Sequence, residues 1–269
     1  MNSQHNWENV VVLEHSNNLT EDYKRLLLDG QISVLVLRNV LPQFLLEKLI
    51  KQVEQGRNNV HTSHYHNGAL TTYGPYLARH LDNPLEYFSK YNEIKNKLPE
   101  AADQIANVAY EEIRQVLALE SMSVAHHNEH QTYSPYILRI HANGVANPLH
   151  NDMIMRDAKG SGLLVEHLNS QLSCVICIQE CAEGGNLKHY NKLWDPKSEQ
   201  FKIQDGLGYY PDVVAGHKEC TYKPQQGDIY LLNPTYFHEI DRVTGDDRIT
   251  LGFFFGFNDE AEKQAVIWS

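Results

Sequence analysis

Apolar and polar positions follow two different patterns along the chain. Up to residue 130, patches of apolar residues recur at the spacing of amphipathic helices. From Gln131 onward, short runs rich in Val, Ile, Leu, Tyr and Phe are separated by turns that contain Gly, Pro, Asn and Asp. The two patterns predict a largely helical part over residues 1–130 and a β-rich part over residues 131–260.

The helical part carries start and stop signals. The first predicted helix runs from Thr20 to Asp29, with Thr20 as its N-cap, acidic residues in its first turn and Gly30 after its end. A second helix is predicted over Gln43–Gln55 and a third over Leu98–Leu119. Between the first two helices, Gln31–Val40 is typical of a short strand.

The β-rich part contains four strand-like segments separated by turn residues. They are TYSPYILRIHANG (132–144), LSCVICIQECAEGG (172–185), CTYKPQQGDIYLLNP (220–234) and RITLGFFFGFN (248–258). Serial short strands of this kind are typical of an antiparallel sandwich or barrel. The helices need this sheet to bury their apolar faces, so we expect a single domain over 1–269, α+β or mainly β.

Composition excludes several classes of protein. The 269 residues are 42% hydrophobic and 21% charged, which is ordinary for a globular protein, and no apolar run is long enough to cross a bilayer. Lys and Arg number 23 against 34 Asp and Glu, and the net charge of −11 repels the phosphates of nucleic acids. The N-terminus lacks the basic and apolar regions of a secretory signal. We expect a cytoplasmic protein whose partner is a small molecule.

Four cysteines invite a zinc hypothesis, which the strand pattern disfavours. Cys174 and Cys177 lie in a segment typical of a strand, where side chains three apart point to opposite faces. They cannot easily share one metal ion. Buried, reduced thiols that pack as small apolar groups are the expected state of all four cysteines.

His150 and Asp152 form a candidate metal-binding pair. A strand, a turn at Gly144 and Pro148 lead into His150-Asn151-Asp152, so the pair lies near a strand edge. Residues two apart on a strand face the same side, and both can then bind one ion. A lone His-x-Asp is nevertheless a weak signal, and the alternative is a loop histidine beside a turn aspartate.

His238 makes the metal hypothesis stronger. It follows a strand that starts at Gly227-Asp228 and ends at Pro234, after enough chain to return across a sheet. Two histidines and one carboxylate form a facial triad that leaves open positions for ligands and O₂, which suits Fe(II). Most of the other histidines lie in no metal-like pattern, and AHHNEH (125–130) is interpreted as a polar loop.

Arg248 is the candidate anchor for a co-substrate. A dicarboxylate that chelates iron through a 2-oxo acid needs its distal carboxylate held, and a guanidinium does this with two charge-assisted bonds. Thr250 faces the same side and offers a hydroxyl. The alternative for Arg248 is a surface residue in a charged turn, beside Asp246 and Asp247.

The order of these motifs resembles a known family. A strand followed by HND, EGGNL, GDIYLLNPTYFH and DDRIT resembles the double-stranded β-helix of the Fe(II)/2-oxoglutarate-dependent oxygenases, and Arg248-Ile-Thr250 resembles their Arg-x-Ser/Thr clamp. The resemblance implies a jelly-roll, cupin-like core with N-terminal helices packed on it. It also implies Fe(II) bound by His150, Asp152 and His238, with 2-oxoglutarate and O₂ as co-substrates.

A narrower resemblance is to the carrier-independent aliphatic halogenases of indole-alkaloid pathways and their hydroxylase relatives. The segments DGQISVLVLRNVLPQF, TYSPYILRIHANG and HLNSQLSCVICIQECAEGGNLKHYNKLWDP carry it. Those halogenases have glycine in place of the metal-binding carboxylate, which leaves room for chloride, whereas this chain has Asp152. The resemblance therefore implies a hydroxylase of an aliphatic C–H, with dealkylation or desaturation open to the same chemistry.

Several further expectations concern the lining of the site and the competing functions. Tyr136 is assigned to the site lining with the cofactor-binding residues, the loop His61–Tyr76 to its mouth, and the insert Trp194–Val213 to a lid. For each of them, ordinary packing or a surface loop is the alternative. One alternative function is a cupin-like module that binds a metal or ligand without turnover, which would not need Arg248. Another is a metal-dependent isomerase or hydrolase, whose activity would persist without O₂.

Overall fold

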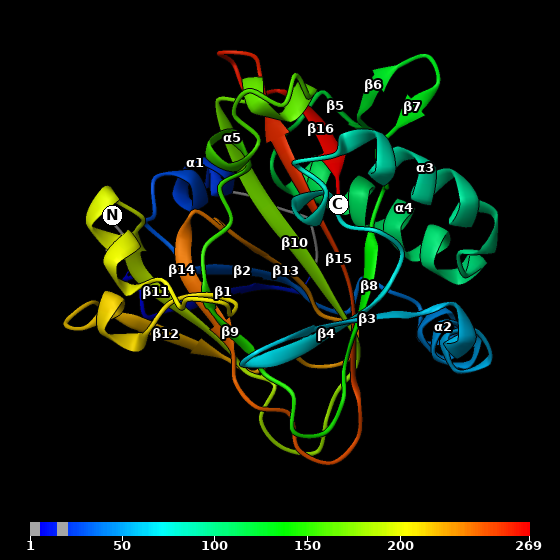
Figure 1. Ribbon diagram of the computed structural model, residues 1–269, viewed down its shortest axis with the longest axis horizontal. Helices are drawn as coiled ribbons and strands as arrows, with labels where there is room; N and C mark the ends of the chain where they lie inside the picture. Colours follow the sequence, from blue (N-terminus) through cyan, green and yellow to red (C-terminus); the bar gives the residue numbers. More distant parts are fainter. Residues whose placement is uncertain (1–5, 15–20) are drawn as a thin grey trace.

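The computed structural model describes residues 6–14 and 21–269 and is built around two facing β-sheets (Figure 1). The strands are β1 (Val10–Leu13), β2 (Val34–Leu37), β3 (His61–Tyr65), β4 (Gly68–Tyr73), β5 (Ser121–Val124), β6 (His126–Asn128), β7 (Gln131–Thr132), β8 (Ile137–His141), β9 (Asn147–His150), β10 (Ser170–Gln179), β11 (Leu187–Leu193), β12 (Glu219–Tyr222), β13 (Ile229–Leu232), β14 (Tyr236–Ile240), β15 (Arg248–Phe257) and β16 (Gln264–Trp268). The α-helices are α1 (Tyr23–Leu28), α2 (Gln43–Gln55), α3 (Pro84–Ile94), α4 (Glu100–Val116) and α5 (Ile154–Asp157).

The two sheets form a jelly roll. Within the described residues, the larger sheet has the order β1-β2-β13-β10-β15-β8-β4-β3, with β16 and β5 attached beside β15, and the smaller sheet has the order β12-β11-β14-β9. The eight consecutive strands from β8 to β15 pass back and forth between these sheets in antiparallel pairs. Figure 1 shows the smaller sheet on one side of the molecule and α2, α3 and α4 on the other. This architecture confirms the predicted fold class.

The part of the chain before residue 130 contains more strands than its pattern predicted. The helix over Gln43–Gln55 is confirmed as α2, and α4 lies inside the predicted 98–119. Asp22 caps α1 by accepting from the amide of Arg25, whereas Thr20 lies outside the described residues. The expected loop 61–76 is largely the hairpin β3–β4, and the expected loop 125–130 holds β6 of the small β6–β7 hairpin. Both hairpins expose mostly polar side chains, which hid their strand character.

Alternation along the larger sheet separates the packed core from the interior of the sandwich. On β10, Leu172, Cys174, Ile176 and Ile178 belong to the core that also contains the buried faces of α2 and α4. The residues between them face the smaller sheet. Because side chains three apart point to opposite faces, Cys174 and Cys177 are separated, and all four cysteines are buried free thiols, as expected.

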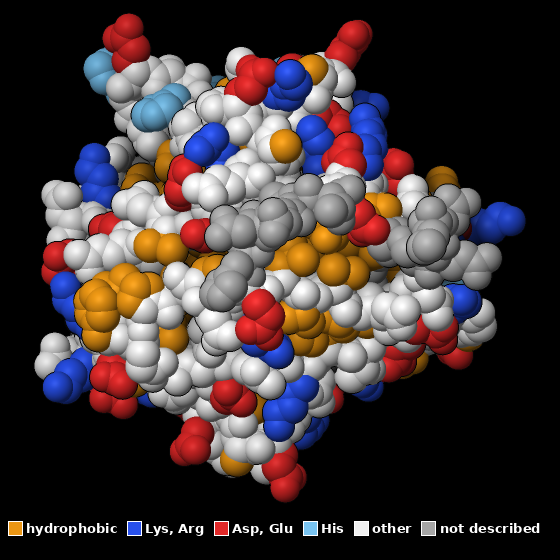
Figure 2. Space-filling model, turned by 180° about the vertical axis from the view of Figure 1, so that it is seen from behind, with side chains coloured by type: hydrophobic (Ala, Val, Ile, Leu, Met, Phe, Trp, Pro, Cys, Tyr) orange, Lys and Arg blue, Asp and Glu red, His pale blue; other side chains and the backbone are white. Residues whose placement is uncertain are grey.

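The surface agrees with the composition. Figure 2 shows acidic and basic side chains interspersed over the face it displays, with no continuous basic area there. Among the described residues, no helix combines the length and the apolar character that a membrane span requires.

Candidate metal centre

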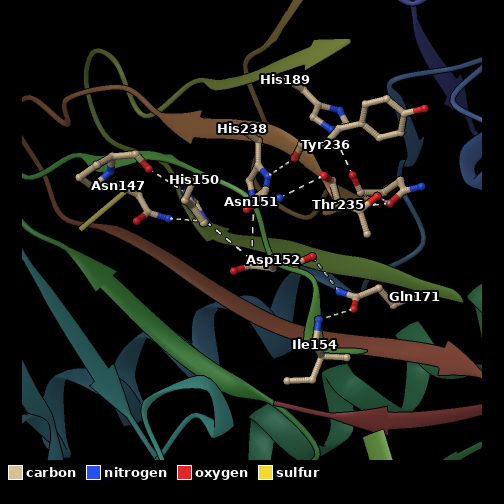
Figure 3. Close-up of polar contacts among 12 residues, drawn as sticks. Asn147, His150, Asn151, Asp152, Ile154, Gln171, His189, Thr235, Tyr236 and His238 are labelled. Carbon is tan, nitrogen blue, oxygen red and sulfur yellow. Dashed lines mark hydrogen bonds and ion pairs between the residues drawn. The ribbon is translucent and has the colours of Figure 1, made fainter. Parts of the chain in front are cut away.

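Three side chains converge between the two sheets. His150 ends β9 and His238 lies on β14, and the two residues are direct partners in the antiparallel pair of these strands. Their Nε2 atoms each lie 3.7 Å from Oδ2 of Asp152. Ligand atoms of the three residues all lie within 4.8 Å of one another, and Figure 3 shows the rings and the carboxylate pointing toward one point. The structure thus brings the predicted triad together.

The histidine rings are held in the tautomer that a metal requires. Nδ1 of His150 donates to the carbonyl oxygen of Pro148 at 2.7 Å, and Nδ1 of His238 donates to that of Tyr236 at 3.0 Å. Each Nε2 therefore carries a lone pair and no proton, and that of His150 lies 3.5 Å from Nδ2 of Asn147. Burial, followed by the neighbouring His150 and His189, holds the pKa of His238 well below its usual range. His238 is thus kept neutral, as a ligand must be.

Asp152 is positioned by loop contacts rather than by a strand. β9 ends at His150, so the expectation that both residues lie on one strand face is wrong. Instead, the amide of Asp152 donates to the carbonyl oxygen of Pro234 at 2.8 Å. Gln171 on β10 donates through Nε2 to the carbonyl oxygen of Asp152 and accepts the amide of Ile154 through Oε1 (Figure 3). These bonds fix the carboxylate beside the two rings.

His189 is a buried, neutral neighbour of the metal ligand His238. It pairs with His238 across β11 and β14, and the two ring centroids are 6.0 Å apart. Its ring is fully buried, with Nδ1 3.0 Å from Oγ of Ser33 and Nε2 3.2 Å from the carbonyl oxygen of Asn233. Burial lowers the pKa of His189 to about 4, so the ring is neutral at pH 7 and adds no positive charge to the metal site.

A cavity of about 200 Å³ adjoins the triad. Part of its lining consists of four buried residues from β8, β13 and β15, which are His141, Tyr230, Arg248 and Thr250. Arg248 is only 3% exposed, which excludes the surface alternative, and its Nη2 donates to the hydroxyl of Tyr230 at 2.9 Å. This end of the cavity offers a guanidinium and hydroxyl groups to an anion.

The EGGNL segment forms part of the wall behind Arg248. Gly185 has a φ of +67°, a conformation that favours glycine. A Cβ on Gly185 would lie 2.7 Å from Sγ of Cys181 and 2.9 Å from Cδ of Arg248. The turn therefore requires glycine for its backbone and for the close approach of the Arg248 side chain.

The predicted lining residues are only partly placed at the cavity. The assignment of Tyr136 to the site lining is wrong. Its side chain points to the same face as those of Leu138 and Ile140 and packs with them in the core that faces the helices. Its hydroxyl donates to Asp103 at 2.7 Å. From the segment 61–76, Tyr65, Leu70 and Tyr76 line the cavity, and from the insert 194–213 only Leu207 does so. The rest of that insert packs largely against the outer face of the smaller sheet.

Two distant segments are in contact beside the cavity. Asn67, at the turn of β3–β4, donates through Nδ2 to the carbonyl oxygen of Leu207 at 2.7 Å and accepts the amide of Leu207 at 2.9 Å. The hairpin and the insert therefore meet beside the cavity.

Sequence reasoning missed three residues that face the interior, which are His141, Gln171 and Tyr230. The signal that identifies them is parity. Once the core-facing residues of each strand are assigned, these residues fall on the opposite face.

The donor set fits the metal that the resemblance implies. Two neutral imidazole nitrogens and one carboxylate oxygen converge on one side of a single point, with cavity on the other side. A facial set of this kind leaves positions open to co-substrates and suits non-haem Fe(II).

Comparison with known proteins supports this interpretation. The sequence profile of the carrier-protein-independent halogenase WelO5 matches residues 8–269. "Leucinostatins biosynthesis cluster protein S" of Purpureocillium lilacinum is 28% identical over 119 residues, which are 41% of this chain and 49% of that protein. The chain therefore spans about half the length of that relative.

Solved structures of similar fold include several 2-oxoglutarate enzymes. An N-substituted L-amino acid dioxygenase from Burkholderia ambifaria AMMD, solved with alpha-KG, has a TM-score of 0.59 at 13% identity, over 91% of this chain and 89% of that one. The epimerase SnoN from nogalamycin biosynthesis has a TM-score of 0.54 at 10% identity, over 90% and 83% of the two chains. These likenesses show the fold alone. The profile match covers nearly the whole chain, and the protein therefore belongs to the WelO5 family of non-haem enzymes that depend on Fe(II) and 2-oxoglutarate.

Proposed function

We propose that this enzyme hydroxylates an aliphatic C–H bond of a free small molecule, such as an amino acid or a natural-product intermediate. Dealkylation or desaturation follows from the same chemistry on other substrates. The observation that carries the proposal is Asp152, whose carboxylate lies 3.7 Å from Nε2 of both His150 and His238.

Asp152 favours oxygen transfer over halogen transfer. Bound Fe(II), 2-oxoglutarate and O₂ together supply the oxidising power to attack an unactivated C–H bond. The halogenases that the chain resembles have glycine at this position, which leaves room for a halide. Here the backbone of Asp152 donates its N–H to the carbonyl oxygen of Pro234 and accepts Nε2 of Gln171 at its own carbonyl oxygen, which places the carboxylate at that position.

Arg248 is the proposed anchor for the distal carboxylate of 2-oxoglutarate. Its guanidinium is buried and makes one hydrogen bond to Tyr230 among the described residues, so other N–H groups remain for a ligand. Thr250 lines the same end of the cavity. His141 faces it with both ring nitrogens unpartnered among the described residues, so it can add a further N–H donor.

The primary substrate is proposed to be mainly apolar where it enters the cavity. The walls away from Arg248 include Leu70, Leu77, Ile154, Phe254 and Trp268. Apolar walls with few polar groups are typical of sites for small organic molecules. A small-molecule substrate also agrees with the profile of a halogenase that is independent of a carrier protein.

The proposal is tested in two steps. Anaerobic addition of Fe(II) and 2-oxoglutarate should produce the weak visible charge-transfer band of their chelate, and addition of O₂ should release succinate. A protein that binds metal but neither chelates 2-oxoglutarate nor forms succinate would instead be a cupin-like binding module.

The reaction outcome is tested by mass spectrometry of products formed in chloride and bromide buffers. We expect only oxygenated, dealkylated or desaturated products from the wild-type enzyme. Asp152→Gly should admit halide to the vacated position, with hydroxylation still competing. A halogen isotope pattern in wild-type products would contradict the role assigned to Asp152.

A further inference from the structure

Arg139 is a second guanidinium in the cavity, and the role of Arg248 does not account for it. On β8, Arg139 pairs with Thr250 of β15. His141, two residues further along β8 and on the same face, pairs with Arg248. The side chain of Arg139 lines the cavity. Within residues 6–14 and 21–269 it makes no hydrogen bond or ion pair at contact distance, unlike Arg248, which donates to Tyr230.

Gly252 creates the space that this guanidinium occupies. The two residues lie on adjacent strands, and a Cβ built on Gly252 would overlap Nη1 of Arg139. Gly252 is not among the glycines with positive φ, so its backbone does not require glycine. Glycine at position 252 therefore leaves room for the guanidinium of Arg139, which reaches over it from the adjacent strand.

An unpaired guanidinium in this position is electrostatically unfavourable. Burial lowers the pKa of Arg139, and Asp152 provides the main attraction that opposes this effect. When Asp152 binds the metal, the metal ion neutralises most of its charge, and the attraction between Asp152 and Arg139 weakens. Arg139 is half-buried, and a cation withdrawn from water without a partner is destabilising, so a carboxylate that accepts its bonds removes part of that penalty.

We propose that Arg139 binds a carboxylate inside the cavity, at a point distinct from the carboxylate held by Arg248. This inference rests on the proposed function, because it concerns the same cavity. The carboxylate has two sources, the 1-carboxylate of 2-oxoglutarate and a carboxylate of the primary substrate. Both present the planar pair of oxygens that a guanidinium binds with two hydrogen bonds.

The test measures binding under anaerobic conditions with Fe(II)-loaded protein, by titration of the chelate band. The ligands are 2-oxoglutarate and 2-oxopentanoate, which keeps the 1-carboxylate and 2-oxo group but lacks the distal carboxylate. The variants are Arg139→Met, Gly252→Ala, Arg248→Met and the control Arg242→Met, which removes an exposed guanidinium bonded to Gly144. Gly252→Ala keeps the charge of Arg139 and displaces only its fork. Iron content and thermal unfolding are measured for each variant.

If the 1-carboxylate is the ligand, Arg139→Met should weaken the binding of both 2-oxo acids by about thirtyfold, the lower end of the range for loss of one partner of a charged pair. Gly252→Ala should act in the same direction. Arg248→Met should weaken 2-oxoglutarate alone, because 2-oxopentanoate lacks the group it holds. Arg242→Met should change neither affinity.

If the substrate carboxylate is the ligand, both 2-oxo acids bind Arg139→Met as they bind wild type. N-acetyl-L-leucine, used as an apolar carboxylate probe, should then shift the chelate band of wild type but not of Arg139→Met, while its amide shifts neither. Equal behaviour of wild type and Arg139→Met toward all of these ligands overturns the inference. Absence of any chelate band in the wild-type protein would instead mean that the proposed function has failed.

Discussion

Replacement of Gly185 by alanine should weaken co-substrate binding without touching the co-substrate. The φ of +67° makes any L-residue strained, at about 1–2 kcal/mol. The new Cβ would also lie 2.7 Å from Sγ of Cys181 and 2.9 Å from Cδ of Arg248. Overpacking of this kind adds about 1–3 kcal/mol. We therefore expect Gly185→Ala to lose about 2–5 kcal/mol of unfolding free energy, since the two effects act together.

The contact should also displace Arg248. Loss of one of its charge-assisted bonds amounts to about 1.5–3 kcal/mol, so we expect 2-oxoglutarate to bind at least about tenfold more weakly. Urea unfolding and anaerobic titration of the chelate band measure the two effects on the same protein.

Gly216→Ala is the matched control for this prediction. Gly216 has a φ of +78°, and a Cβ there would meet no atom within 4 Å. The control should therefore lose only the backbone contribution, about 1–2 kcal/mol, and bind 2-oxoglutarate as wild type does. If the two variants were equally stable and bound 2-oxoglutarate equally well, the proposed packing of Gly185 against Arg248 would be refuted.

Three further predictions follow from the site. His150→Ala or His238→Ala should nearly abolish iron binding, because two ligands hold Fe(II) poorly. Elemental analysis after anaerobic reconstitution measures the iron content, and full iron occupancy in both variants would refute the triad. Arg248→Met should weaken 2-oxoglutarate by about 2–5 kcal/mol with iron content unchanged, and an unaltered dissociation constant would assign the distal carboxylate to another residue. Burial lowers the pKa of His141 to about 3, against about 6.5 in the unfolded chain. The unfolded state therefore takes up a proton first, and stability present above pH 6.5 is lost as the pH falls, by about 2 kcal/mol at pH 5. Urea unfolding above pH 6.5 and at pH 5 should show that His141→Asn loses less unfolding free energy than the wild type does. An identical loss would contradict the buried, neutral state of His141.

The predictable part of the structure is the part set by local pattern. Alternation and turn residues predict the jelly-roll strands β8, β10, β13 and β15, and helical spacing predicts α2 to the residue, whereas β9 and β14 lie outside the predicted segments. The metal ligands could be predicted because the required residue types are few and their chemistry is specific.

The remainder depends on tertiary placement. Asp152 is positioned by Pro234 and Gln171, which are distant in sequence, and no local pattern reveals such bonds. The position of Tyr136 on the strand before the triad suggests a site residue, whereas strand parity turns its side chain toward Asp103 and the helices. The hairpin β3–β4 was missed because an edge hairpin with exposed polar side chains lacks the apolar alternation that identifies a strand.

The contact between Asn67 and Leu207 has a consequence for how this enzyme can diversify. The two segments that meet there are the hairpin at one end of the larger sheet and the insert between β11 and β12. Neither segment contributes a metal ligand, and the strands that carry His150 and His238 pair directly with each other. Because the insert also hydrogen-bonds β9 through the amide of Tyr209 and the carbonyl oxygen of Leu149, the hairpin turn at Asn67 is the place where mutation or a change of length can alter the entrance while the register of β9 and β14 stays intact. Selection can therefore act on which molecules enter separately from the reaction they undergo.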